Sequence, residues 1–282
     1  MTADRLDPAL LRLALPAETW PLLLVLPEVS STQDWAESLA LRGAPDGTVV
    51  LAEHQTAGRG RAGRRWLAPP GSSLLVSLLL RPDLPTDRLH LLTALGGLAV
   101  LAGIRTITGL ACRLKWPNDI VWAGRKLGGL LTQTEIVGDR VTVALLGLGL
   151  NVNFDPALYP DLAASATSLQ CALGRPVPRL PLLVAILQAL ATDRPALQTA
   201  PAALHAAWRA AIETLGQTVV VTTPTGALAG LAEDVDERGA LIVRTPSGQR
   251  VHCLLGEVTV RPADGSSAAD ARPAAADGSP PP

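Results

Sequence analysis

The amino-acid sequence predicts an α+β protein with a large domain at residues 21–214 and a small all-β domain at residues 215–262. Two observations predict this class. Apolar runs of strand length and longer segments of helical character follow one another up to Gly216. After Gly216, about five short β-rich runs are separated by TPTG, DERG and PSG turns, which is typical of a small barrel of SH3-like size. A chain of 282 residues is long enough for a sizeable core.

The two ends of the chain differ in composition from these domains. Residues 1–20 are expected to be a short N-terminal extension with some helical character. Residues 263–282 are rich in Ala, Pro, Gly, Ser and Asp and contain no large apolar residue. Such a segment cannot bury a core, so we predict a disordered tail.

The first elements of the large domain are predicted to be a strand, a helix and a second strand. Residues 22–29 form an apolar run of strand length. The next segment, QDWAESLALRG, is expected to be a helix because Ser31 or Thr32 can cap its start and Gly43 can end it. A PDG turn then leads to TVVLAEHQ at 48–55, the second strand.

A loop rich in glycine and arginine, TAGRGRAGRRW, precedes the third strand, SSLLVSLLLRP, which ends at Pro82. Residues 87–107 predict a long apolar helix. The segment RLKWPNDIVWAGRKLGGLLTQTEI predicts a strand, a turn and a hairpin through Ala123 and Gly124. Residues 141–153 predict a further strand.

The last part of the large domain, residues 179–214, is expected to be helical with breaks at Pro195 and Pro201.

Charge and composition exclude several classes of protein. The 24 basic and 25 acidic residues give a formal net charge of −1, so no general attraction to nucleic acid or anionic membranes is expected. No uninterrupted apolar run reaches the roughly 18–20 residues that span a bilayer. The first residues lack a basic segment followed by an apolar one, so we expect a cytoplasmic protein.

Cysteine and histidine give no sign of a metal centre. Cys112, Cys171 and Cys253 are odd in number and far apart, which predicts small buried thiols rather than disulfides or a CxxC site. The four histidines show no metal-ligand spacing.

Rare residues point to one window. The chain contains 22 Arg but only two Lys and three Asn. Lys115, Asn118 and Lys126 all fall within KWPNDIVWAGRK, and the other two Asn lie in GLGLNVN. A compact ammonium is not interchangeable with a planar guanidinium. We therefore treat this window as a candidate site.

The segment Gly58–Trp66, GRGRAGRRW, has the composition of an anion-binding loop. Its glycines let backbone N–H groups approach an anion, and its arginines add forked donors for phosphate or carboxylate. It matches neither the P-loop nor the GxGxxG pattern. Solvated basic loops and RGG-like nucleic-acid segments share this composition. Because its four arginines repel one another, the loop is expected to be mobile until a polyanion binds.

The KWPND turn carries a second set of chemically useful groups. Pro117 restricts the turn, so Asn118 and Asp119 are presented at a strand end. Asp119 can hold a divalent metal or orient an amine, although an Asx-turn uses the same residues. The hairpin can return Lys126 close to Lys115, and two ammonium groups suggest an anionic centre such as an α-phosphate. The small residues of GLGLN suit either a ligand lying on the backbone or a tight strand crossing.

Together these elements resemble the biotin–protein ligase, or biotin–[acetyl-CoA-carboxylase] ligase, family. The matching elements are SSTQD, EHQTAGRGRAGRRW, SSLLVSLLLRP, RLKWPNDIVWAGRKLGGLL, GLGLNVN and GEVTVRP, in order from about residue 25 to 262. The resemblance implies a catalytic domain related to class II aminoacyl-tRNA synthetases, a mixed sheet with packed helices, and an SH3-like barrel after it. It also implies a monofunctional type, since no winged-helix DNA-binding domain precedes Ser31, and therefore no specific binding of DNA.

The implied reaction has two steps that use ATP, biotin and Mg²⁺. Biotin becomes biotinyl-5′-AMP with release of pyrophosphate, and a lysine of a biotin carboxyl carrier protein then displaces AMP. A homodimer through an exposed sheet edge is a separate hypothesis.

The resemblance also implies roles for individual residues. The catalytic set would be Lys126, Arg59, Arg61, Lys115 and Asp119. Biotin would be bound by Ser31, Thr32, Gln33, Gln55, Arg59, Gly60, Arg61, Lys126, Gly129 and Gly147. The nucleotide would be bound by Arg61, Arg64, Trp66, Lys115, Asn118, Asn151 and Arg261, with Glu257 also reaching in from the small domain.

Two positions depart from the family pattern, and two other functions compete. Gln33 replaces the commoner Asn, and Gln133 stands where the family often has Glu. A lipoate or octanoate ligase of the same fold is the nearest alternative, but GRGRxGRxW together with KWPND argues against it. The second alternative is a non-catalytic regulator that senses biotin or a nucleotide. The presence of Lys115 and Lys126 argues against this regulator.

Overall fold

The computed structural model describes residues 4–223, 226–254 and 256–260 of the chain. An eight-stranded mixed sheet forms the centre of the large domain, in the order β1-β2-β3-β8-β7-β6-β5, with β4 paired to β8. The pairing of β1 with β2 is parallel and every other pairing in this sheet is antiparallel. Its strands are β1 Leu23–Val29, β2 Thr48–Gln55, β3 Ser73–Leu80, β4 Leu84–Pro85, β5 Arg113–Lys115, β6 Asp119–Trp122, β7 Arg125–Val137 and β8 Arg140–Asn151.

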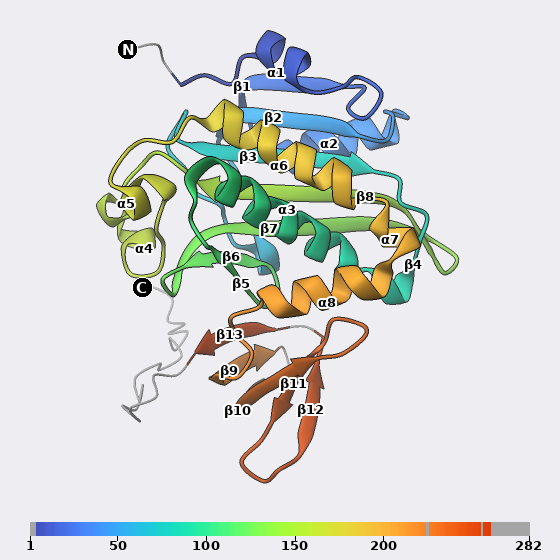
Figure 1. The fold of residues 1–282 in the computed structure, drawn as a ribbon, viewed down its shortest axis with the longest axis vertical. Helices are drawn as coiled ribbons and strands as arrows, with labels where there is room; N and C mark the ends of the chain where they lie inside the picture. The colour runs from blue at the N-terminus through green and yellow to red at the C-terminus, as the bar shows by residue number, and fades with distance from the viewer. Residues whose placement is uncertain (1–3, 224–225, 255, 261–282) are drawn as a thin grey trace, which may run out of the picture.

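Helices cover both faces of this sheet (Figure 1). The helices of the large domain are α1 Pro8–Ala14, α2 Thr32–Leu41, α3 His90–Thr108, α4 Pro160–Ala163, α5 Leu169–Leu173, α6 Arg179–Asp193, α7 Ala196–Thr199 and α8 Pro201–Ala211. Single 3₁₀ turns lie at η1 Arg61–Gly63, η2 Thr86–Arg88 and η3 Pro156–Leu158. The breaks predicted at Pro195 and Pro201 are present, because α6, α7 and α8 end or begin beside these prolines.

The two faces carry different cores. The helix α2 packs its small residues Ala36 and Ala40 on Val50, Leu79 and neighbouring apolar side chains. The larger core lies on the other face, where α3 and α6 cross closely. A Cβ at Gly103 of α3 would come within 2.4 Å of Ile186 of α6. The glycine is therefore needed for this helix pair to approach.

Two helical segments, Thr86–Thr108 and Arg179–Thr199, are long and apolar enough to cross a membrane by length and composition alone. The sequence contains no uninterrupted apolar run of bilayer-spanning length, but these two helical segments reach that length when a few polar residues are allowed. Both segments include helices whose leucines are buried in the larger core, among them Leu95 and Leu187. Core packing therefore accounts for much of the apolar character of Thr86–Thr108, whose apolar window is 56% buried, and for less of that of Arg179–Thr199, where 33% is buried.

The N-terminal segment packs on the sheet through α1. Leu6, Leu11, Leu15 and Trp20 are all buried in the larger core. Their burial contributes apolar surface to the same core as the sheet and its helices.

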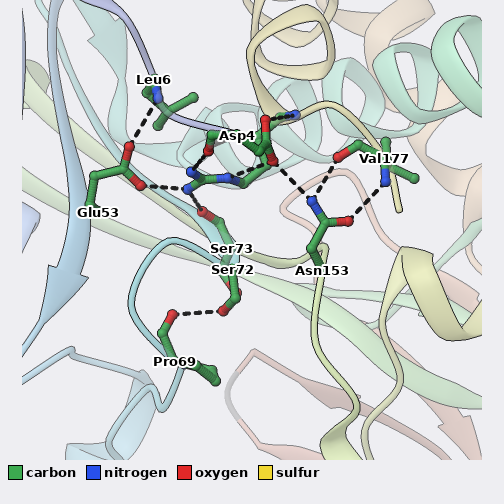
Figure 2. Close-up of polar contacts among 9 residues, drawn as sticks. Asp4, Leu6, Glu53, Pro69, Ser72, Ser73, Asn153 and Val177 are labelled. Atoms are coloured by element: carbon green, nitrogen blue, oxygen red, sulfur yellow. Dashed lines mark hydrogen bonds and ion pairs between the residues drawn. The ribbon is translucent and has the colours of Figure 1, made fainter. Parts of the chain in front are cut away.

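A buried arginine fastens this segment to the rest of the domain (Figure 2). Arg179, at the start of α6, is only 1% exposed. Its Nε lies 3.1 Å from Asp4 Oδ2, and its Nη1 donates to Glu53 Oε2 at 2.7 Å and to the Ser73 carbonyl at 3.1 Å. Glu53 also accepts the N–H of Leu6 at 2.9 Å. The buried charge is thus paired and hydrogen-bonded, as a stable interior requires.

The chain after Gly216 forms a separate five-stranded antiparallel sheet in the order β12-β11-β10-β9-β13. Its strands are β9 Thr218–Thr223, β10 Gly226–Val235, β11 Leu241–Arg244, β12 Arg250–Cys253 and β13 Glu257–Val260. Within the described residues no pairing joins β12 to β13, so the described sheet is not a closed barrel. The predicted tail at 263–282 lies outside the described residues.

The prediction of three buried thiols is wrong at one position. Cys112 and Cys253 are buried, whereas Cys171 is exposed. Cys171 belongs to the short helix α5, and little of this helix is covered by the core.

Candidate active site

A cavity of about 610 Å³ opens over the sheet and brings together residues from both domains. Its wall includes Ser31, Thr32, Gln33, Gln55, Arg59, Gly60, Arg61, Arg64, Trp66, Lys115, Asn118, Asp119, Lys126, Gly129, Gly147, Asn151 and Glu257. These are all of the site residues predicted from the sequence except Arg261, which lies outside the described residues.

One end of the cavity is lined by uncharged polar groups at the start of α2. Ser31 caps this helix, and its Oγ accepts the N–H of Gln33 at 3.2 Å. The N–H and hydroxyl of Thr32 donate to Gln55 Oε1 at 2.7 and 3.0 Å. A Cβ at Gly147 would come within 2.7 Å of Gln33 Oε1, so only glycine leaves room for that carboxamide. This end suits a neutral ligand group with several hydrogen-bonding atoms.

The glycine- and arginine-rich loop folds over the cavity as a short hairpin. The N–H of Gly60 donates to the Arg64 carbonyl at 2.7 Å, and that of Trp66 donates to the Gly58 carbonyl at 2.9 Å. Ala62 sits at the tip with a φ of 53°, a left-handed conformation that is uncommon for alanine.

Each arginine of the loop that lines the predicted site has a partner from a distant segment. Arg59 Nη1 lies 2.7 Å from Asp34 Oδ1 of α2. Arg61 Nη1 donates to Asn118 Oδ1 at 3.1 Å. Arg64 pairs with the Glu257 carboxylate at the start of β13. These contacts offset the mutual repulsion of the arginines and link the loop to both domains.

Burial changes the pKa of Arg61 in this loop. Desolvation lowers the pKa of its guanidinium from the ordinary value, while the nearby carboxylates of Asp119 and Glu257 act in the opposite direction. A guanidinium stays charged at neutral pH. An anionic ligand at this point would therefore compensate a charge that is poorly solvated.

A further cationic group, outside the arginine loop, is Lys126 at the start of β7. The predicted tight turn precedes it, with Ala123 and Gly124 at φ values of 49° and 72°. Lys126 Nζ lies 2.7 Å from Asp119 Oδ1 and 5.8 Å from the centre of the Trp66 ring. The carboxylate and the ring face hold the ammonium in place.

Two buried polar atoms in the cavity wall have no partner among the described residues: the Trp66 indole Nε1 and Asn151 Oδ1. One is a donor and the other an acceptor. Buried polar atoms are normally paired, so both are available to a ligand with a complementary polar edge. A Cβ at Gly149 would come within 2.4 Å of the Trp66 ring, which explains the small residue on the strand below it.

Sequence reasoning missed several groups of the wall. Ser77 of β3 lines it, as do residues from the stretch 161–166 and three neighbours of Glu257 in the small domain. Ser77 was visible only as a lone hydroxyl in an apolar strand. Trp116 of the KWPND turn is buried, and its Nε1 donates to the Gly239 carbonyl of the small domain at 2.9 Å.

Among the residues that the structure describes, no three His, Cys, Asp or Glu side chains gather in a way that could hold a metal ion. The carboxylates of Asp119, Asp161 and Glu257 line the cavity separately. They suit a cation that is held mainly by the phosphates of a ligand and only in part by the protein.

Comparisons with known proteins agree with these observations. Residues 25–151 match the model of the biotin/lipoate A/B protein ligase family, and residues 214–261 match that of the biotin protein ligase C terminal domain. The chain is 36% identical over 247 residues to the bifunctional ligase/repressor BirA of Bacillus subtilis, covering 86% of this chain and 76% of the relative. It is 34% identical over 223 residues to the biotin–[acetyl-CoA-carboxylase] ligase of Paracoccus denitrificans, covering 77% and 92%.

Solved structures show the same likeness. The biotin protein ligase from Aquifex aeolicus in complex with biotin and ATP superposes with a TM-score of 0.70 at 29% identity, covering 86% of this chain and 99% of that one. The ordered set of motifs, the cavity they line and these relatives lead to one conclusion: the chain belongs to the biotin–protein ligase family.

Proposed function

We propose that this chain activates biotin with ATP to biotinyl-5′-AMP and transfers the biotinyl group to a lysine of a biotin carboxyl carrier protein. One observation carries the proposal: a single cavity joins a neutral, hydrogen-bonding end at Thr32 and Gln55 to a cationic end at Arg61 and Lys126. Biotin has the complementary shape, with a cyclic urea at one end and a carboxylate at the other. The names of the relatives support the same activity.

In the first step, a carboxylate oxygen of biotin attacks the α-phosphorus of ATP. A new P–O bond forms, the bond to pyrophosphate breaks, and pyrophosphate leaves. Negative charge accumulates around phosphorus in this step, and Lys126, Arg59 and Arg61 are placed to stabilise it. Lys115, the first residue of the KWPND turn, lines the same cavity and adds a further positive charge.

Mg²⁺ is proposed as the companion of the nucleotide. It would be held by ATP phosphates together with a cavity carboxylate such as Asp119 or Glu257, and it would neutralise phosphate charge.

In the second step, the amine of the acceptor lysine attacks the biotinyl carbonyl and AMP leaves. Asp119 is proposed to orient this amine. Its present partner is the Lys126 ammonium at 2.7 Å, and phosphate oxygens bound by Lys126 would free the carboxylate for that role. The loop Gly58–Trp66 would keep water from the mixed anhydride.

Three further properties belong to the same proposal. The C-terminal sheet is proposed to be an SH3-like module, because five short antiparallel strands fit its size. No specific binding of DNA is proposed from the balanced charge. A cytoplasmic location stays a proposal. A homodimer is proposed through a sheet edge, at which β1 and β5 end the strand order.

The test is ATP–pyrophosphate exchange with biotin, lipoate or octanoate supplied separately. We expect exchange that requires both biotin and Mg²⁺, followed by transfer to a carrier domain. Exchange with lipoate and none with biotin would instead identify a lipoate ligase of the same fold.

A further inference from the structure

Ser77 is a polar residue in an apolar strand, and neither the motifs nor the comparisons assign it a role. It lies in β3, whose sequence is SLLVSLLL, and pairs with Gly147 of β8 and Val50 of β2. The residue is 0% exposed. A hydroxyl is buried at the centre of a sheet only at a cost in free energy, unless it has hydrogen-bond partners.

Its partners are two residues of the neutral end of the cavity. Ser77 Oγ lies 2.9 Å from Thr32 Oγ1 and 2.9 Å from Gln33 Oε1. Thr32 Oγ1 lies in turn 3.0 Å from Gln55 Oε1. A continuous chain of oxygens therefore runs from Gln33 through Ser77 and Thr32 to Gln55.

The direction of the Gln33 carboxamide is fixed. Its nitrogen donates to the backbone carbonyl of Leu145 at 3.1 Å and lies 3.4 Å from that of Leu131. Carbonyl oxygens only accept hydrogen bonds, so the amide nitrogen must face the backbone and the carboxamide oxygen must face Ser77.

The chain of oxygens has fewer protons than contacts. Three O···O contacts join its members, yet Ser77 and Thr32 supply one hydroxyl proton each. If Ser77 donates to Thr32, the Gln33 oxygen receives no proton from the chain. If instead Ser77 donates to Gln33 and Thr32 donates to Ser77, the Gln55 oxygen receives only the backbone N–H of Thr32. In a third arrangement Ser77 donates to Gln33 and Thr32 donates to Gln55, and the contact between the two hydroxyl oxygens has no proton. An amide oxygen has two lone pairs, so in all three arrangements a carboxamide oxygen in the cavity wall can accept a further hydrogen bond from a ligand.

We propose that Ser77 is a positioning residue that sets the direction of this hydrogen-bond chain and thereby selects a cyclic urea over a cyclic disulfide as the head group of the ligand. The inference rests on the proposed function and deepens it. A urea ring supplies N–H donors for a carboxamide oxygen that can accept a further hydrogen bond. A dithiolane ring supplies no donor and would leave buried oxygens unpaired, which a polar site penalises strongly.

The test compares Ser77→Ala with Ser73→Ala. Ser73 lies in the same strand, is 1% exposed, and has its hydroxyl 3.5 Å from that of Ser72 rather than near the chain of oxygens. We expect Ser77→Ala to raise the dissociation constant and the KM for biotin by roughly 10- to 100-fold, the size expected when a buried acceptor loses its donor. The KM for ATP and the kcat at saturating biotin should stay within about threefold of the parent. Ser73→Ala should leave all four constants unchanged.

Desthiobiotin separates positioning from simple packing, because it keeps the cyclic urea and lacks the sulfur ring. A loss of the same factor for desthiobiotin and biotin supports an effect through the urea. A loss confined to biotin, or a Ser77→Ala protein that binds biotin as Ser73→Ala does, would overturn the inference. A parent protein without biotin-dependent exchange would refute the proposed function instead. Ser77→Cys, which keeps the size with a weaker donor, should give an intermediate value.

Discussion

At the scale of single residues, Lys126 is the group whose removal should be most damaging to the chemical step. Its ammonium is held by Asp119 at 2.7 Å and by the face of Trp66, on a hairpin that the sheet keeps rigid. We predict that Lys126→Ala slows biotinyl-adenylate formation by about 10²–10³-fold, as the loss of one preorganised electrostatic donor does elsewhere. Single-turnover adenylate formation is the measurement.

Lys126→Arg should restore only part of this rate, because a planar fork does not replace a compact ammonium between Asp119 and the Trp66 ring. Arg140→Ala is the matched control for loss of one positive charge, since Arg140 is exposed and pairs with Asp83 at the far end of β8. Adenylate formation at the parental rate in Lys126→Ala would contradict the role assigned to this lysine.

The residues of the site could be predicted to the extent that they lie in short motifs. GRGRAGRRW and KWPND each present several groups within a few positions, so the sequence reveals them together. Ser77 could not be found in this way, because its partners Thr32 and Gln33 are 45 and 44 positions away. Only the fold reveals such a contact.

At the scale of elements, apolar runs and prolines predicted most strands and helices, since both are local signals. The arginine loop is the instructive exception. Four positive charges in seven residues predict a segment that is mobile until a polyanion binds, and this stays a prediction. What the loop's own sequence does not predict is the hairpin that the structure shows. The carboxylates of Asp34 and Glu257 that balance its charge come from α2 and β13, which nothing in the loop itself indicates.

The contact between α3 and α8 should make the stability of the fold sensitive to acid. His90 Nε2 of α3 lies 3.0 Å from His205 Nδ1 of α8. Burial, together with the neighbouring His205, lowers the pKa of His90 to about 4, although Asp236 and Asp87 oppose the shift. The unfolded chain therefore binds this proton more readily, and the stability that neutral His90 contributes is complete above about pH 6.5. This stability is lost as the pH falls from about 6.5 towards 4.

We predict that His90→Gln flattens the acid side of the stability curve, measured as the free energy of unfolding by urea between pH 7 and 4. The difference between parent and variant should shrink as the pH falls. His54→Gln removes a half-buried histidine that pairs with Glu28 and serves as the control. An acid slope equal to that of the parent in His90→Gln would show that this contact does not set the acid sensitivity.

At the scale of the whole molecule, the cavity depends on both domains staying together. The sequence predicted two domains, but their relative placement depends on contacts between distant residues. Trp116 makes one of them, because its indole Nε1 donates to the Gly239 carbonyl at 2.9 Å. Its backbone N–H donates to Thr214 Oγ1 at 3.1 Å, at the end of the large domain. Its neighbours Lys115 and Asn118 line the cavity. Trp116 therefore contacts the small domain and also holds the turn whose Lys115 and Asn118 are predicted to bind the nucleotide.

Trp116→Phe keeps most of the apolar volume and removes the indole N–H. The Gly239 carbonyl loses its donor, so we predict a loss of about 1–3 kcal/mol in the free energy of unfolding and a larger rise in the KM for ATP than in that for biotin. Trp20→Phe is the matched control, because Trp20 is 1% exposed and its Nε1 has no hydrogen-bond partner among the described residues. The control should lose stability through ring size alone and keep both KM values, since Trp20 lies outside the cavity wall. If the two variants shift the KM for ATP equally, the contact between the domains does not position the turn.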